Sequence, residues 1–153
     1  MSDSTLKTNL VVIGGGPGGY TSAFRAADLG QKVILIDKNT NLGGVCLNRG
    51  CIPSKSLLHL SKIINDSKKA ENMGVKFSSP IINVKNIHQW KNKIISDLSH
   101  GISKLAKARN IKIINAHASF NSANQLTVVD QQNKGIEVLF DNCIIATGSK
   151  PQV

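Results

Sequence analysis

Two cysteines, Cys46 and Cys51, are separated by four residues in the stretch GGVCLNRGCIPSK, residues 43–55. Cysteines at this spacing can be metal ligands, a structural disulfide, small buried hydrophobic side chains or a redox couple. A tetrahedral zinc site needs two further ligands, and Cys-x4-Cys is not a common zinc spacing. We therefore expect no metal site, because no ligand cluster is formed in the sequence by the histidines His59, His88, His100 and His117.

The surroundings of the cysteine pair favour a redox-active couple. Cys51 is expected where a helix starts, and Lys55 follows it closely. A helix N-terminus and a nearby ammonium group both stabilise a thiolate, which is the reactive species in thiol–disulfide exchange. Gly43 and Gly44 would let the backbone pass close to a bound ligand. Two inert buried thiols are the alternative.

The first 37 residues read as a βαβ unit. Short apolar runs rich in β-branched residues predict buried strands over residues 9–13 and 32–37. Between them, apolar residues at helical spacing predict a helix over residues 20–30 that ends at Gly30.

The glycine-rich turn GGGPGG follows the first predicted strand and opens the helix. Gly14, Gly16 and Gly19 match G-x-G-x-x-G, a pattern that permits a tight turn, close approach of a pyrophosphate and packing of helix on strand. The helix N-terminus offers free N–H groups to phosphates. Asp37 ends the second strand, where a carboxylate can accept hydrogen bonds from ribose hydroxyls. The pattern predicts dinucleotide binding and does not decide between FAD and NAD.

The remainder of the chain changes from helical to strand periodicity. Residues 53–74 and 87–110 predict two helices, and the period of two beyond residue 111 predicts a strand followed by a small antiparallel β-meander. An apolar strand over residues 143–146, which includes Cys143 as an expected core thiol, runs into Thr-Gly. We predict an α/β fold: a Rossmann-like domain with a parallel sheet, crossover helices and a small antiparallel β-meander. The apolar face of the first helix carries Leu57, Leu58, Ile63 and Ile64. The apolar face of the second helix carries Ile87, Trp90, Ile94, Leu98, Ile102 and Leu105.

Composition bounds the class of protein. The chain of 153 residues is long enough for one domain with a core. It contains no apolar run of membrane-spanning length and no secretory signal, so a cytoplasmic protein without a membrane partner is expected. The net charge of +10 comes from scattered basic residues with one Trp and one Tyr, a distribution that does not favour nucleic-acid binding.

The cysteine stretch carries a specific family resemblance. GGVCLNRGCIPSK resembles the active-site signature of the flavin-dependent pyridine nucleotide–disulfide oxidoreductases. Within that family, CLNRGCIPSK followed by SLLH is similar to the dihydrolipoamide dehydrogenases; glutathione reductases typically have a second lysine where Ser54 stands, and mercuric reductases tend to have valine at both apolar positions. The resemblance covers essentially the whole chain, including NLVVIGGGPGGY and IIATGSKP.

The resemblance implies FAD as cofactor and NAD+ as the final electron acceptor of a longer enzyme. Cys46 would exchange with a lipoyl sulfur, Cys51 would lie against the flavin, and Lys55 would favour the negative charge of the reduced flavin. Gly14, Gly16 and Gly19 would hold the FAD pyrophosphate, and Asp37 would bind the adenosine ribose. The implied cofactor-binding residues are Gly14, Gly16, Pro17, Gly19, Asp37, Lys38, Gly44, Lys55, Ala118, Thr147 and Gly148.

The resemblance also implies partners and missing parts. Residues 1–153 would be the N-terminal segment of the FAD-binding domain, with the NAD-binding domain, the dimerisation domain and a catalytic His–Glu dyad outside it. The implied partners are a lipoyl-bearing protein of a 2-oxo acid dehydrogenase or glycine cleavage complex and a second copy in a homodimer. Alternatives are a glutathione or mercuric reductase-like enzyme, a non-catalytic FAD-binding fragment, or a partial chain whose sheet has an open edge. The sequence departs from the family pattern at Asp37 (commonly Glu), Arg49 (commonly Val) and Ala118 (commonly Gly).

Overall fold

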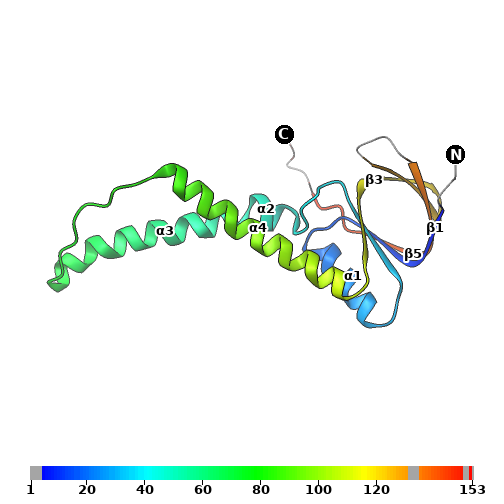
Figure 1. The fold of residues 1–153 in the computed structure, drawn as a ribbon, viewed down its shortest axis with the longest axis horizontal. Helices are drawn as coiled ribbons and strands as arrows, with labels where there is room; N and C mark the ends of the chain where they lie inside the picture. Colours follow the sequence, from blue (N-terminus) through cyan, green and yellow to red (C-terminus); the bar gives the residue numbers. More distant parts are fainter. Residues whose placement is uncertain (1–4, 131–134, 150–151, 153) are drawn as a thin grey trace.

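The computed structural model describes residues 5–130, 135–149 and 152 (Figure 1). The predicted mixture of helices and strands is confirmed, although most of the expected turn at residues 130–135 lies outside the described residues. In the described part of the chain, every helix is too short or too polar to cross a membrane. In chain order the elements are β1 (Leu6–Ile13), α1 (Pro17–Asp28), β2 (Val33–Asp37), α2 (Gly44–Arg49), α3 (Cys51–Lys69), the 3-10 helix η1 (Ala70–Met73), α4 (Val84–Ala108), β3 (Lys112–Ser122), β4 (Gln125–Asp130) and β5 (Gly135–Ile145).

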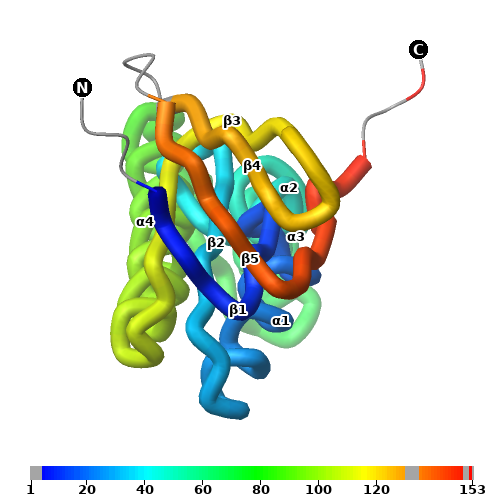
Figure 2. The backbone as a smooth tube through the Cα atoms, turned by 90° about the vertical axis from the view of Figure 1, so that its right-hand side faces the viewer, coloured from blue at the N-terminus to red at the C-terminus, as the bar shows by residue number. Residues whose placement is uncertain are grey.

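The five strands close on one another in the order β1-β2-β3-β4-β5, with β5 beside β1 (Figure 2). β1 pairs in parallel with β2 and β5, and β2 pairs in parallel with β3. β3, β4 and β5 form the predicted antiparallel meander. Strands β3 and β5 are long, and each contains two of the short strands predicted from the sequence. One of the two pairs in parallel, and the other belongs to the meander.

The expectation of an open sheet edge is met only locally. The described strands close into a barrel, yet residues 142–145 of β5 have a registered partner on the β1 side alone. Ile145, at the end of that segment, is 65% exposed. The open edge is therefore confined to the last part of one strand.

Strands β1 and β2 are buried on both faces, which explains their continuous apolar sequences. Leu10 and Val12 pack with residues of α1 and α4 in one cluster, whereas Val11 packs between the strands in a second cluster. Alternate side chains of a strand point to opposite faces, so one short run contributes to both clusters. The expected core thiol Cys143 packs against the second cluster, as predicted.

Helices α3 and α4 lie side by side and extend away from the strands (Figure 1). Both predicted helices are confirmed, and α4 begins with an N-cap in which Asn83 accepts from the N–H of Asn86 at 3.0 Å. Their apolar faces are only partly covered: Ile102 packs on the core, but Trp90 is 40% and Leu58 66% exposed. The side of α4 that meets the core carries small residues, with Ser99 and Ala106 buried.

We predict that Gly19→Ala destabilises the protein and that the neighbouring Gly18→Ala does not. A Cβ at Gly19 would lie 1.7 Å from the carbonyl oxygen of Gly14, whereas a Cβ at Gly18 meets nothing within 4 Å. Forcing an extra carbon against main chain costs about 1–3 kcal/mol, and an unstrained Gly-to-Ala change gains about 0.4–1 kcal/mol. Urea unfolding without cofactor, followed by circular dichroism, measures both. Equal unfolding free energies would contradict the packing of helix α1 on the turn.

Candidate functional site

The first glycine-rich turn links three parallel strands at their carboxyl ends. The N–H of Gly14 donates to the carbonyl of Ile36 at 2.7 Å, and the N–H of Ala146 donates to the carbonyl of Ile13 at 2.8 Å. Gly14 has a φ of +107°, and a Cβ there would lie 2.2 Å from the Ala146 carbonyl oxygen. Only glycine fits this position, so the turn brings the ends of β1, β2 and β5 together.

A second glycine pair, Gly43 and Gly44, contacts the first turn directly. The N–H of Gly43 donates to the carbonyl of Gly15 at 2.8 Å. Gly44 has a φ of +62°, and a Cβ there would lie 2.7 Å from Cα of Gly16. The sequence did not predict this contact between the two turns, and the expectation that Gly43 and Gly44 approach a ligand stays a prediction.

Asp37 holds the first turn from the end of β2. Its Oδ2 accepts from the N–H of Gly15 at 2.5 Å, and its Oδ1 accepts from the backbone and side-chain nitrogens of Asn39 at 2.7 and 2.9 Å. Gly15 was not among the predicted site residues, because the motif fixes only the glycines on either side of it. The triplet of consecutive glycines was the available signal.

Helix α4 supports the loop that leads to the cysteines. The buried hydroxyl of Ser99 donates to the carbonyl of Leu42 at 3.1 Å, and the Leu42 side chain is itself buried in the core. Asn48 adds a bond from its side-chain nitrogen to the carbonyl of Gly44 at 2.9 Å. Ser99 was missed by the sequence analysis, because 57 positions separate it from Leu42 and no local pattern links them.

The two cysteines lie on consecutive helices. Cys46 is part of α2, a short helix that the sequence did not predict, and Cys51 is the first residue of α3, as predicted. Gly50, with ψ of −103°, separates the two helices. Both cysteines are free thiols in the structure; Cys46 is half-buried and Cys51 is exposed.

The Cys51 side chain is close enough to affect the ionisation of the Cys46 thiol. The pKa of the Cys46 thiol is raised, first by a hydrogen bond with the Cys51 side chain and then by desolvation and the charge of Cys51. The backbone N–H of Cys51 and the ammonium group of Lys55 act in the opposite direction. The structure therefore brings together Cys46, Cys51 and Lys55, three residues that the sequence selected.

The other predicted cofactor residues lie at different distances from this centre. The backbone nitrogen of Thr147 would be 3.1 Å from a Cβ on Gly14, so the last turn reaches the first glycine turn. Lys38 is exposed just after β2. Ala118 lies in β3 opposite Val128, beyond the end of β2, and is not brought to the cysteines.

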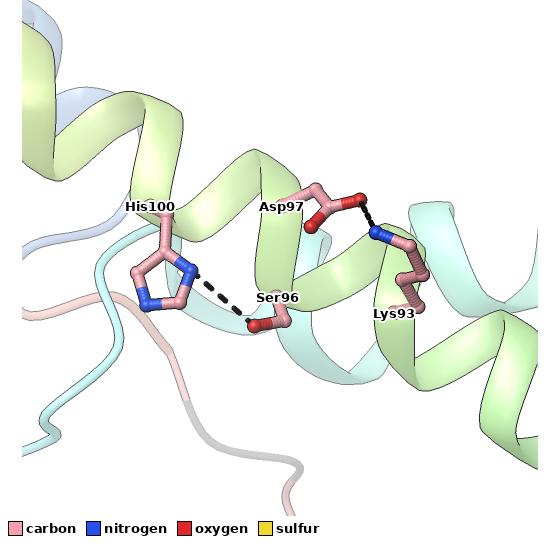
Figure 3. Close-up of polar contacts among 4 residues, drawn as sticks. All are labelled: Lys93, Ser96, Asp97 and His100. Carbon is pink, nitrogen blue, oxygen red and sulfur yellow. Dashed lines mark hydrogen bonds and ion pairs between the residues drawn. The ribbon is translucent and has the colours of Figure 1, made fainter.

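The described residues contain no group of three or more His, Cys, Asp or Glu side chains that could hold a metal ion. Ser96, Asp97 and His100 lie together on α4 and have the residue types of a catalytic triad (Figure 3). Ser96 lies 3.4 Å from Nδ1 of His100, but Asp97 is bound instead to Lys93 at 2.8 Å and points away from the imidazole. The exposed group is two separate pairs of neighbouring helical residues.

Comparison with known proteins relates this geometry to one family. A family profile described as "Pyridine nucleotide-disulphide oxidoreductase" matches residues 8–153. A dihydrolipoyl dehydrogenase of Buchnera aphidicola subsp. Acyrthosiphon pisum is 49% identical over 94% of this chain and 30% of that protein. Proteins of the same name from Vibrio parahaemolyticus and Staphylococcus aureus are 44% and 43% identical, over 95% and 99% of this chain and 30% and 32% of theirs. The chain spans about a third of the length of these curated relatives.

We predict that Cys51→Ala increases the rate at which iodoacetamide alkylates Cys46 in the reduced protein. The substitution removes the side-chain groups that raise the Cys46 pKa, while the backbone N–H at position 51 and Lys55, which lower it, remain. A lower pKa gives more thiolate at neutral pH, so alkylation becomes several-fold faster. Mass mapping of labelled peptides against pH measures the rate. Cys143, whose pKa is raised by burial, is the internal reference. An unchanged or slower rate at Cys46 would contradict the coupling.

Proposed function

The chain belongs to the pyridine nucleotide–disulphide oxidoreductase family, and on this premise we propose that it is the N-terminal FAD-domain segment of a dihydrolipoyl dehydrogenase. The observation that carries the proposal is the contact between the two glycine turns, which fixes the cysteine helix against the dinucleotide-type turn. Proteins of this family bind FAD and use NAD as co-substrate. The substrate of the whole protein would be a dihydrolipoyl group.

The residues at the carboxyl ends of the strands fit FAD. A Cβ at Gly16 would meet its nearest heavy atom only at 3.7 Å, and one at Gly18 none within 4 Å, so the backbone is open to a pyrophosphate. The N-terminus of α1 starts at this turn and favours an anion. Asp37 accepts three hydrogen bonds, and a carboxylate has about four lone-pair sites, so it retains capacity for a ribose hydroxyl. The remaining proposed cofactor residues are Gly14, Pro17, Gly19, Lys38, Gly44, Lys55, Ala118, Thr147 and Gly148.

The cysteine pair would carry the exchange with substrate. A dihydrolipoyl thiolate bonds to the Cys46 sulfur and breaks the Cys46–Cys51 disulfide, leaving the pair of electrons on Cys51 as a thiolate. The second dihydrolipoyl sulfur, after loss of its proton, closes the lipoyl disulfide and releases Cys46 as a thiolate. Two electrons thereby reach the pair, and two protons leave the dithiol for protein thiols or solvent. Bound FAD supplies the acceptor for these electrons.

The ammonium group of Lys55 has a role in this exchange that follows from its place in α3. It lowers the pKa of the Cys46 thiol and so favours the thiolate that leaves in the second step. We also propose Lys55 as a flavin contact, because it lies one helical turn after Cys51. Because this ammonium group is exposed, it can stabilise negative charge on the Cys46 thiolate or on a bound flavin.

The organisation of the whole protein is proposed from the family. We propose that residues 1–153 are part of an FAD-binding domain and that NAD-binding and dimerisation domains lie outside them; the unmatched length of the relatives leaves room for both. The electron donor would be a lipoyl-bearing protein of a 2-oxo acid dehydrogenase or glycine cleavage complex. A homodimer in the cytoplasm completes the proposal.

We predict that Gly16→Ala weakens FAD binding without destabilising the protein. Cα of Gly44 would be 3.7 Å from the new Cβ, an ordinary contact, and Gly16 has an ordinary φ of −75°. The fold therefore tolerates the methyl group, but a pyrophosphate that approaches the backbone does not. We expect the dissociation constant of FAD to rise at least about tenfold, equivalent to about 1.4 kcal/mol. Fluorescence titration measures binding, and urea unfolding of the cofactor-free protein is the control. Unchanged affinity would contradict the pyrophosphate site.

We predict that Cys46→Ser abolishes the NAD-linked oxidation of dihydrolipoamide by the full-length, FAD-loaded protein. A hydroxyl cannot form the mixed disulfide, so the rate should fall more than about 10³-fold, while the flavin absorbance spectrum shows that FAD stays bound. Cys143→Ser, at a thiol packed on the core, is the matched control. If the wild-type protein reduces glutathione disulfide and does not oxidise dihydrolipoamide, a related reductase is favoured. If the wild-type protein binds flavin without any turnover, a non-catalytic FAD protein is favoured.

A further inference from the structure

Arg49 lies on the outer face of the helix that carries Cys46. Leu47 is the buried residue of α2 and points into the protein. At about 100° per residue, positions two steps before and after Leu47 fall on the opposite face, and these are Val45 and Arg49. Both are exposed, Val45 by 65%. Arg49 follows Cys46 by three positions, so the two side chains are neighbours on the helix surface.

The charge of Arg49 is not used inside the described part of the chain. The ion pairs there join Lys76 with Glu71, Lys93 with Asp97, and Arg109 with Asp28. Among these described residues, the side chains that shift the pKa of Cys46 are Cys51 and Lys55, and Arg49 is not one of them. Among the described residues Arg49 has no ion-pair partner, so its exposed guanidinium group is available to an anionic group outside this segment.

The sequence around Arg49 contains no negative charge to compensate it. Residues 38–65 include no Asp or Glu. The basic residues of this stretch are Lys38, Arg49, Lys55 and Lys62, and all four are exposed. A partner that reaches the Cys46 sulfur along the outer face of α2 meets the exposed Arg49, and no acidic residue of this stretch offsets its charge. Complementary charge speeds such encounters and selects among partners.

We propose that Arg49 binds an acidic surface next to the dithiol of the protein that exchanges with Cys46. This inference rests on the proposed function and adds a selectivity for acidic over neutral dithiol carriers. The planar guanidinium group can bind a carboxylate through two hydrogen bonds, which a solvated lysine does less well. The Val45 side chain offers an apolar contact beside it. The bond changes at sulfur are those already given, and Arg49 takes no part in them.

The test measures reduction of the Cys46–Cys51 disulfide in the full-length, FAD-loaded protein by stopped flow. The probes are two short peptides that carry dihydrolipoyl-lysine, one rich in Glu and one rich in Gln, and the result is the ratio of their rates. We expect Arg49→Gln to lower the Glu-to-Gln ratio about three- to tenfold at low ionic strength. Arg49→Lys should give an intermediate ratio, because it keeps the charge and loses the two-point hydrogen bond. High salt should bring wild type and Arg49→Gln together.

Lys85→Gln is the matched control, because it removes the same charge from an exposed position on α4. It should leave the ratio at the wild-type value. A ratio near one in the wild type, or equal losses with both peptides in Arg49→Gln, would overturn the proposal. NAD-linked turnover of dihydrolipoamide is recorded separately: its absence would contradict the proposed function, while the peptide ratio still decides the role of Arg49.

Discussion

The position of the cysteine pair depends on a main-chain contact between two glycine-rich turns. The N–H of Gly43 binds the carbonyl of Gly15, and Gly44 lies so close to Gly16 that a Cβ would come within 2.7 Å of its Cα. Because Gly44 has no side chain, its backbone can lie directly against Gly16, and this contact helps to set the distance from the first glycine turn to α2. A Cβ at Gly44 would displace α2, and Cys46 with it. The geometry of the site therefore depends on the absence of a side chain at Gly44.

Polar bonds from distant elements keep the two turns in place. Asp37 holds Gly15 from the end of β2, and Ser99 holds the carbonyl of Leu42 from α4. The strand that ends in Asp37 is buried on both faces, so its end is set by the core. The packed core thus fixes the loops that precede the cysteines. The interactions that stabilise the fold also hold the two cysteines in place.

The sequence predicted those parts of the structure that depend on local spacing. The buried strands and the first glycine motif follow from short patterns, and Asp37 follows from its place at a strand end. Helix α2 was missed because six residues that begin with glycine give no helical period. Closure of the barrel was missed because β5 pairs with both β1 and β4, a register that no local pattern specifies. The exposure of Leu58 and Trp90 could not be predicted either, because periodicity identifies an apolar face and does not show what covers it.

The two cations near the cysteines differ in their effect on the Cys46 thiol. The side chain of Cys51 raises the pKa of Cys46, and the charge of Lys55 acts against this rise. Arg49 leaves the thiol unperturbed and faces solvent, where charges interact over a Debye length of about 8 Å at physiological ionic strength. A change at the outer position can therefore alter which partner docks without altering the ionisation of the sulfur. Under the proposed role of Arg49, recognition can change while the exchange reaction stays the same, because Lys55 and not Arg49 contributes to the pKa of Cys46.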